Sequence, residues 1–271
     1  MASLSAQAAS QLRSSALPRP LDPSVPSNRF ALLGTGAALL LALLAGRGWR
    51  ASLGVGGAAF LGWASARELD PDAPLSASLA LGLSGLGALL GGSPKLLPGY
   101  TVLSGLRVLA GTVGPAASDA DALALSAGAA LSRLGGQETA ALLPAGALWL
   151  SGRQSDGLQP PAWAAPLAAG AGLLAPGRRS TSQDHTVLSD LLSLAALGTA
   201  GVLLRPEEPS SRQDQTSRRV SGSRVHSARL LSLAALGLGL LRGQSASLLP
   251  LAAACLGTAL RRGLALEPGK G

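Results

Sequence analysis

The chain has 271 residues and a net charge of +8, and 47% of its residues are hydrophobic although only 3% are aromatic. Leu and Ala supply nearly all of the hydrophobic fraction, Ile is absent, and charged residues reach only 13%, about half the usual share in soluble domains. This composition argues against a water-soluble core, which needs bulky, well-shaped groups, and the mean hydropathy of +0.35 argues against a wholly disordered chain. An integral membrane protein is expected, because lipid solvates Leu and small residues let helices approach closely.

The positive charge does not indicate a nucleic-acid partner, because the arginines lie between apolar segments or in tails rather than along one face. Cys255 is the only cysteine, so neither an intramolecular disulfide nor a thiolate metal cluster is possible. We interpret it as a small apolar residue in a helix, and we expect no cofactor.

A flexible basic tail is predicted for residues 1–29, and a series of apolar segments follows it. The fold class that this order predicts is an all-α, multi-pass transmembrane bundle of about 8–10 helices, built from short helical hairpins. The predicted regions are a membrane region (30–204), a hydrophilic basic loop (205–229), a C-terminal helical hairpin (230–262) and a C-terminal tail (263–271). The apolar segments are 30–46, 51–66, 75–93, 96–113, 120–132, 139–151, 161–176, 186–204, 230–241 and 247–260.

Most of these segments have 13–19 residues, fewer than the ~20 that usually span a bilayer at 1.5 Å per residue. Segments 120–132 and 230–241 therefore remain open to a re-entrant or interfacial placement. Alternation with a period of two is absent and Val is scarce, so helices are favoured over a β-barrel.

Aromatic and basic residues lie near the segment ends. Of the seven aromatic residues, only Phe60 is far from a segment end, which is typical of rings at the headgroup level. If all ten segments cross and the N-terminus is cytoplasmic, 15 basic residues lie inside and 7 outside, as the positive-inside rule requires. We therefore predict cytoplasmic N- and C-termini, and the short spans favour a thin membrane such as the endoplasmic reticulum or another endomembrane.

The sequence also contains internal similarity. The octamer LLSLAALG occurs at 191–198 and at 230–237. A second pattern occurs three times: it starts with an apolar run and Gly, continues with a few polar residues and Leu-Leu-Pro, and finishes with another apolar run that ends in Arg. Its prolines, Pro98, Pro144 and Pro250, are predicted to lie in the first turn of a helix, where the missing N–H costs nothing. Duplicated hairpins are typical of transporters, and chance repetition of a Leu/Ala/Gly vocabulary is the alternative.

Two charged residues inside the apolar segments, Arg107 and Asp190, are candidates for an intramembrane ion pair, because charge at membrane depth is costly. Both also lie close enough to segment ends to reach the interface instead. In the basic loop, Arg218 and Arg219 precede Ser221, a pattern that favours phosphorylation of this serine. A solvated, positive-inside loop is the alternative.

No HExxH, GxSxG, phosphate-loop or paired-carboxylate pattern occurs, so an enzyme is not expected. The leading hypothesis is a non-enzymatic multi-pass membrane protein that acts as a scaffold or accessory subunit. Its expected partners are the lipid bilayer and other membrane proteins, which would bind through small-residue helix faces. The alternative is a small-solute or ion transporter or channel built from the repeated hairpins.

Overall fold

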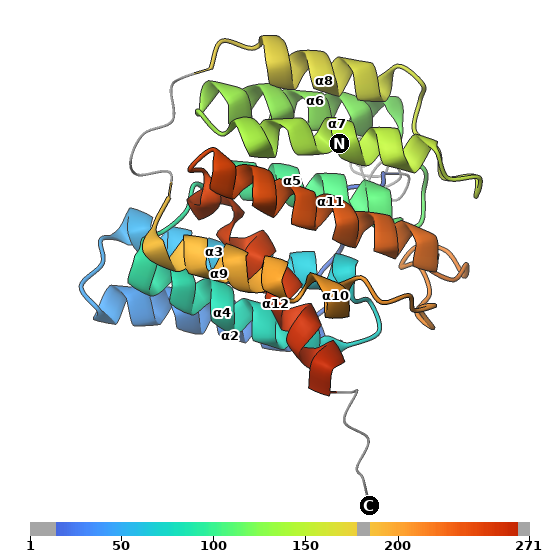
Figure 1. The fold of residues 1–271 in the computed structure, drawn as a ribbon. Helices are drawn as coiled ribbons and strands as arrows, with labels where there is room; N and C mark the ends of the chain where they lie inside the picture. Colours follow the sequence, from blue (N-terminus) through green and yellow to red (C-terminus); the bar gives the residue numbers. More distant parts are fainter. Residues whose placement is uncertain (1–14, 178–184, 265–271) are drawn as a thin grey trace, which may run out of the picture.

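The computed structural model describes residues 15–177 and 185–264, and 70% of these are helical, with no strand among them (Figure 1). The first and last parts of the two predicted tails lie outside the described residues. The described part contains eleven α-helices and one short 3-10 helix, η2 (Ser245–Leu248). The α-helices are α2 (Pro26–Leu44), α3 (Trp49–Leu69), α4 (Pro74–Gly91), α5 (Leu96–Ala110), α6 (Asp119–Leu134), α7 (Glu138–Gly152), α8 (Ala164–Leu174), α9 (Val187–Gly198), α10 (Ala200–Leu203), α11 (Gly222–Leu241) and α12 (Leu249–Leu264).

Each of the ten apolar segments corresponds to helix, and the two largest differences concern α9–α10 and α11. The segment 186–204 is interrupted at Thr199 and forms both α9 and α10. Helix α11 begins at Gly222, eight residues inside the predicted loop, and is 20 residues long. Three helices, α2, α4 and α11, are long and apolar enough to cross a membrane.

The long helices run back and forth between two ends of the bundle, in chain order (Figure 1). Hydrogen bonds between connections far apart in sequence show which of them meet: Arg19 bonds to Asp214, and Gln244 donates to the Gly136 carbonyl. The proximal end is formed by residues 15–25, 70–73, 111–118, 153–163 and 204–221 and by the C-terminus of α12. The distal end is formed by residues 45–48, 92–95, 135–137 and 242–248 and by the start of α9.

Two groups of helices make up the bundle. Helix α3 packs against α2, α4, α5 and α12, whereas α7 packs against α5, α6, α8 and α11. Helix α5 contacts both groups, and α9 lies on α12 and α11. Although α4 and α5 are consecutive, α5 packs on α3 and α7 and not on α4, so this copy of the repeat is an open pair and not a closed hairpin.

Glycine brings α3, α4 and α12 unusually close together. A Cβ atom on Gly62 of α3 would lie 2.7 Å from the Ala80 carbonyl oxygen of α4, and one on Gly257 of α12 would lie 2.9 Å from the Ala80 nitrogen. Ser84 also donates a 2.7 Å hydrogen bond to the Ala58 carbonyl across the α3–α4 contact. Small residues therefore set the helix separation here, as in membrane helix pairs.

The three repeat prolines do not share one position. Pro98 and Pro250 lie in the first turns of α5 and α12, as predicted. Pro144 lies inside α7, whose first turn begins six residues earlier at Glu138, so the prediction for Pro144 was wrong. Because proline has no N–H, the carbonyl four residues earlier lacks its usual helical partner.

The predicted N-terminal tail is attached to the bundle over its described part. Ser15 donates a hydrogen bond to Asp121 of α6, Ala16 is buried, and Arg19 pairs with Glu68 of α3. Helix α2 then begins at Pro26, before the predicted boundary at residue 30. Residues 15–25 thus form part of the proximal end.

Candidate functional site: an uncharged belt between two polar ends

Every described helix has a middle section without a charged side chain. Charged residues lie in the end turns or close to them, with Arg107 near the end of α5 and Arg229 in the third turn of α11 as the deepest. We call the remaining sections the uncharged belt: residues 30–44, 51–66, 74–91, 96–106, 122–132, 139–152, 164–174, 191–203, 230–241 and 249–260. At 1.5 Å per residue the belt extends from about 16 Å in α6 to about 27 Å in α4.

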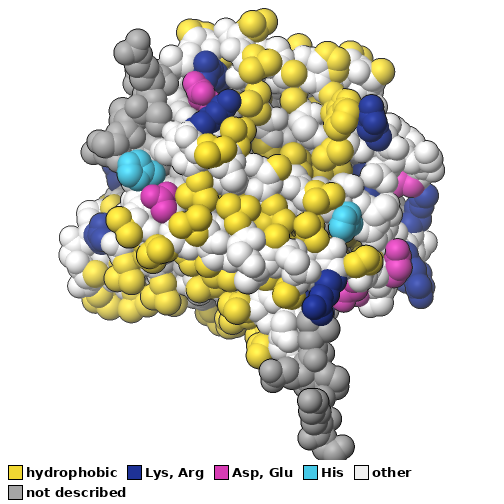
Figure 2. Space-filling model, in the orientation of Figure 1, with side chains coloured by type: hydrophobic (Ala, Val, Ile, Leu, Met, Phe, Trp, Pro, Cys, Tyr) yellow, Lys and Arg dark blue, Asp and Glu magenta, His cyan; other side chains and the backbone are white. Residues whose placement is uncertain are grey.

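Exposed leucines occur both within the belt and at its margins. Leu33 of α2 is 75% exposed, Leu86 of α4 is 55% exposed, and Leu241, the last residue of α11, is 87% exposed. In the view of Figure 2, charged side chains gather toward the two ends of the bundle, and hydrophobic and uncharged groups cover the surface between them. A helix at the surface of a water-soluble protein normally places charged residues on this face, and a contiguous apolar surface of this kind marks contact with a membrane or a partner.

Exposed aromatic rings lie at both margins of the belt. Trp149 and Trp163 are at the proximal margin, and Trp49 begins α3 at the distal margin. The guanidinium group of Arg153 stacks 4.2 Å from the Trp149 ring centre. Trp63 differs from this pattern, because it is only 2% exposed and belongs to the core.

Glu68, at the end of α3, connects three parts of the proximal end. Its carboxylate is fully buried and accepts from Arg107 Nε at 3.2 Å and from Arg19 Nη1 at 3.3 Å. Thr112 donates to the same carboxylate, and Arg107 Nη1 donates to the Leu17 carbonyl at 2.7 Å. The two arginines supply the positive charge that a buried carboxylate requires.

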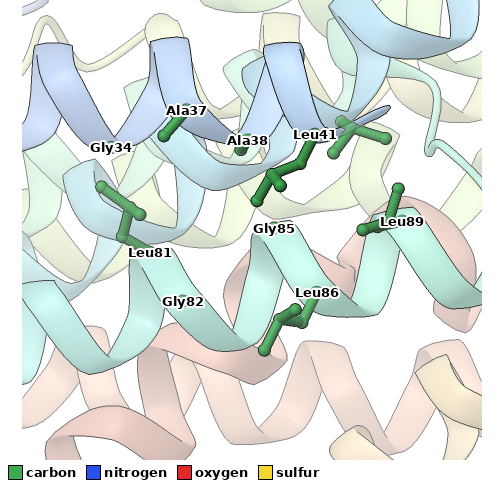
Figure 3. A pocket seen from close by; sticks show the side chains of 10 residues that line it. Gly34, Ala37, Ala38, Leu41, Leu81, Gly82, Gly85, Leu86 and Leu89 are labelled. Atoms are coloured by element: carbon green, nitrogen blue, oxygen red, sulfur yellow. The ribbon is translucent and has the colours of Figure 1, made fainter. Parts of the chain in front are cut away.

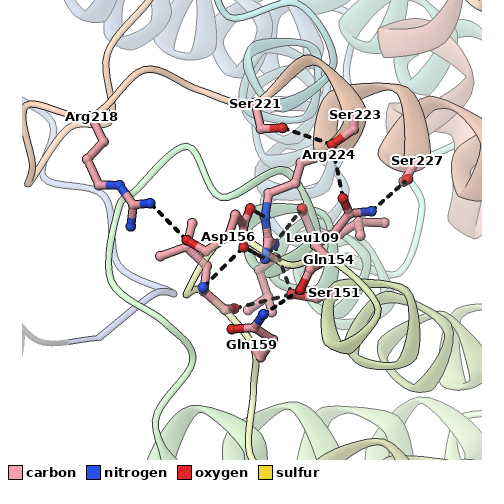
Figure 4. Close-up of polar contacts among 12 residues, drawn as sticks. Leu109, Ser151, Gln154, Asp156, Gln159, Arg218, Ser221, Ser223, Arg224 and Ser227 are labelled. Atoms are coloured by element: carbon pink, nitrogen blue, oxygen red, sulfur yellow. Dashed lines mark hydrogen bonds and ion pairs between the residues drawn. The ribbon is translucent and has the colours of Figure 1, made fainter.

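Arg224 of α11 forms a second buried network at the proximal end (Figure 4). Its side chain is fully buried and pairs through two nitrogens with Asp156, at 2.8 Å for Nη2. Nη1 donates to the carbonyls of Val108 and Leu109, in the last turn of α5, and to Ser151 Oγ at 2.9 Å. Hydrogen bonds from Arg224 hold the pKa of Asp156 below its usual value.

A third network joins the 204–221 connection to α12. Glu207 accepts from Arg262 and lies 3.6 Å from Arg229, while Arg262 also donates to the Arg205 carbonyl at 2.7 Å. Nearby, burial raises the pKa of Asp70, which lies 3.6 Å from Arg261. The backbone of this connection is therefore attached at several points and does not lie free in solvent.

Among the described residues, the distal end has fewer ion pairs than the proximal end. Glu138 binds both Arg133 and Arg242. Arg47 and Arg50 have no carboxylate within ion-pair distance anywhere in residues 15–177 and 185–264. Within the described part of the chain, no carboxylate thus neutralises the positive charge of the α2–α3 turn.

The structure does not bring Arg107 and Asp190 together. Arg107 lies at the proximal end on Glu68, whereas Asp190 lies in the first turn of α9 at the distal end. Asp190 accepts from Ser245 and lies 3.5 Å from His185. Both residues lie in the end turns of their helices, which agrees with the alternative that each lies near a segment end and not with a pair between them.

Ser221 is the N-cap residue of α11 and is partly exposed. Its hydroxyl lies 2.9 Å from that of Ser223, which donates to Gln154 (Figure 4). Arg218, one of the two arginines that precede Ser221, donates to the Asp156 carbonyl at 2.8 Å. Phosphorylation of Ser221 stays a prediction.

Sequence reasoning missed the buried networks around Glu68 and Arg224. One signal was present: Glu68, Asp70 and Asp72 fall within five residues, in a turn between two apolar segments. The described residues contain no group of three or more His, Cys, Asp or Glu side chains placed to hold a metal ion.

Comparison with known proteins yields no match, whether the chain is compared with family models, with curated proteins or with solved structures.

Proposed function

We propose that the chain is an integral membrane protein whose uncharged belt lies in the hydrocarbon region, with the proximal and distal ends in the two interfaces. The observation that carries this proposal is the charge distribution, because the sections of the uncharged belt carry no charged side chain although leucines in them, such as Leu33, are highly exposed. Placing a charged side chain at the centre of a membrane helix costs about 2.5–3.5 kcal/mol.

We further propose that the protein is a non-enzymatic scaffold or accessory subunit of other membrane proteins. Its buried polar groups are used for internal structure: Glu68 and Arg224 hold helix ends together. Small residues of the belt that are partly or fully exposed, such as Gly36 and Gly201, offer faces for close helix contact. The transporter alternative rests on the repeats, and ion or solute flux in reconstituted vesicles would favour it over a scaffold.

One substitution distinguishes a lipid-facing belt from a water-facing one. Leu33→Arg places a charge on an exposed position of α2, which would be nearly neutral in water but costs about 2–3 kcal/mol in lipid. We expect a loss of membrane-integrated protein, measured as the fraction that resists carbonate extraction. Ser217→Arg, at an exposed site of the proximal end, is the matched control and should integrate normally.

A wild-type protein that stays folded and monomeric in buffer without amphiphile would refute the membrane proposal. Equal integration of both variants would refute the placement of the belt.

Orientation can be measured with single cysteines, because the native Cys255 is fully buried. Ser217→Cys reports the proximal end, and Gly48→Cys, where an added Cβ meets no atom within 4 Å, reports the distal end. In sealed microsomes with their cytoplasmic side outward, we expect an impermeant maleimide to label Ser217→Cys directly and Gly48→Cys only after permeabilisation, because more basic residues lie at the proximal end.

A further inference from the structure

An apolar groove runs between α2 and α4 on the belt surface (Figure 3). It encloses about 210 Å³. In Figure 3, Leu41 of α2 points toward α4 near Gly85, and Leu81 of α4 points toward Gly34 of α2. The groove spans about two helical turns, or roughly 10 Å at 1.5 Å per residue. Its lining is Gly34, Ala37, Ala38, Leu41, Val55, Leu81, Gly82, Gly85, Leu86 and Leu89.

Glycines create this groove by omitting side chains on facing surfaces. A Cβ atom on Gly85 would lie 3.5 Å from that of Ala38, so the two helices are close at that level. A Cβ atom on Gly82 would meet no atom within 4 Å, so the space beside it is open. The gap is thus shaped for a slender apolar group that enters from the lipid side.

Positive charge lies at the distal end of the groove. Arg47 Nη2 donates a 2.6 Å hydrogen bond to the carbonyl of Leu89, one of the lining residues. Arg50 is exposed on the first turn of α3. The other arginines of the described distal end share Glu138, whereas no described carboxylate is within ion-pair distance of Arg47 or Arg50.

We propose that the groove binds one anionic diacyl phospholipid of the surrounding bilayer. One acyl chain lies between α2 and α4, and the headgroup phosphate meets Arg47 and Arg50. The proposal rests on the proposed membrane location, which supplies the lipid. Charge complementarity selects an anionic headgroup, because no described carboxylate neutralises either guanidinium group and each arginine near the surface is worth about 1 kcal/mol toward anionic lipid.

Native mass spectrometry of the full chain, released from bilayers of equal phosphatidylglycerol and phosphatidylcholine, tests this site. We expect the wild type to retain one phosphatidylglycerol, and the double variant Arg47→Gln/Arg50→Gln to retain roughly thirtyfold less. Gly82→Leu fills the open space and should remove bound lipid of both kinds. Gly36→Leu, on α2 with no atom within 4 Å of its added Cβ and outside the lining, is the matched control, and Arg153→Gln controls for loss of charge.

The outcomes separate the two proposals. If the lipid retained is the same in all variants while the protein remains membrane-integrated, the lipid site is refuted and the membrane location stands. If Gly82→Leu changes the oligomeric mass and leaves lipid retention unchanged, a second copy of the chain occupies the groove, and the lipid site is refuted. If the protein needs no amphiphile, the membrane location itself fails.

Discussion

Asp156 and Arg224 form a pair in which only the arginine is fully buried. Replacing Asp156 with Asn keeps one acceptor but removes the charge that compensates Arg224. We expect a loss of about 1.5–3 kcal/mol in the free energy of unfolding, the usual range for a hydrogen bond to a charged group. Thermal or denaturant unfolding of the detergent-solubilised protein measures it, and the exposed Asp119→Asn, on α6, is the control.

The same pair predicts a pH dependence with a definite sign. Because Arg224 lowers the pKa of Asp156 in the folded state, the stabilisation is complete above the unfolded carboxyl pKa of about 4 and is lost as pH falls through the lower folded value. The difference between wild type and Asp156→Asn should therefore shrink below about pH 4. A constant difference across the acidic range would contradict this assignment.

Pairwise coupling tests the arrangement of charges at the two ends. Arg107 contacts Glu68 at 3.2 Å, whereas Asp190 belongs to the other end. A double-mutant cycle with Arg107→Gln and Glu68→Gln should give a coupling of about 1–3 kcal/mol. The cycle of Arg107→Gln with Asp190→Asn should be additive within about 0.5 kcal/mol. Coupling in the second cycle, measured by unfolding in detergent, would contradict the structure.

At the scale of elements, the α4–α12 contact depends on a missing side chain. Gly257→Ala places a Cβ 2.9 Å from two backbone atoms of α4, and overpacking of this kind costs about 1–3 kcal/mol. Gly237→Ala on α11, where the added Cβ meets nothing within 4 Å, should stabilise by up to about 1 kcal/mol through helix propensity. The unfolding midpoint should fall in Gly257→Ala and rise in Gly237→Ala relative to the wild type. Equal changes in the midpoint of the two variants would show that the close contact between α12 and α4 is absent.

Much of the helical order could be predicted from the sequence, because apolar runs and the polar residues that separate them are local signals. The start of α11 could not, since Arg224 and Arg229 read as loop residues. Both side chains are buried only because other elements supply Asp156 and the Leu69 carbonyl. The interior position of Pro144 was likewise missed, because polar Gln137-Glu138 already starts that helix.

The candidate sites were harder to predict than the helices. Glu68 and Arg107 are 39 residues apart, and Arg224 and Asp156 are 68 apart, so neither pair leaves a spacing signal. The sequence did identify Arg107 as unusual, but it could not identify the partner. Partner choice depends on which helix ends meet, and α5 packs on α3 and α7 and not on its neighbour α4.

At the scale of the whole molecule, the basic residues lie unequally at the two ends, because successive helices run in opposite directions. The sequence assigns 15 basic residues to one side and 7 to the other on the single assumption that successive segments cross in alternate directions. The structure places the described members of each set at the corresponding end of the bundle (Figure 1). The two ends of the bundle therefore differ in positive charge, which is the asymmetry that the positive-inside rule uses.

The thickness of the belt leads to a last prediction. The belt extends only about 16–27 Å, whereas a typical hydrocarbon core is about 30 Å thick. A bilayer that surrounds the protein must thin or the protein must tilt, each at a cost of a fraction of a kcal/mol per Å. The protein should therefore unfold at a higher temperature in bilayers of 14-carbon phosphatidylcholine than in bilayers of 22-carbon phosphatidylcholine, as measured by tryptophan fluorescence.

Lengthening the belt with Arg50→Leu and Arg29→Leu, both exposed at its margins, should reduce that difference in unfolding temperature. Equal unfolding temperatures in the two bilayers would mean that the exposed leucines do not define the hydrocarbon boundary.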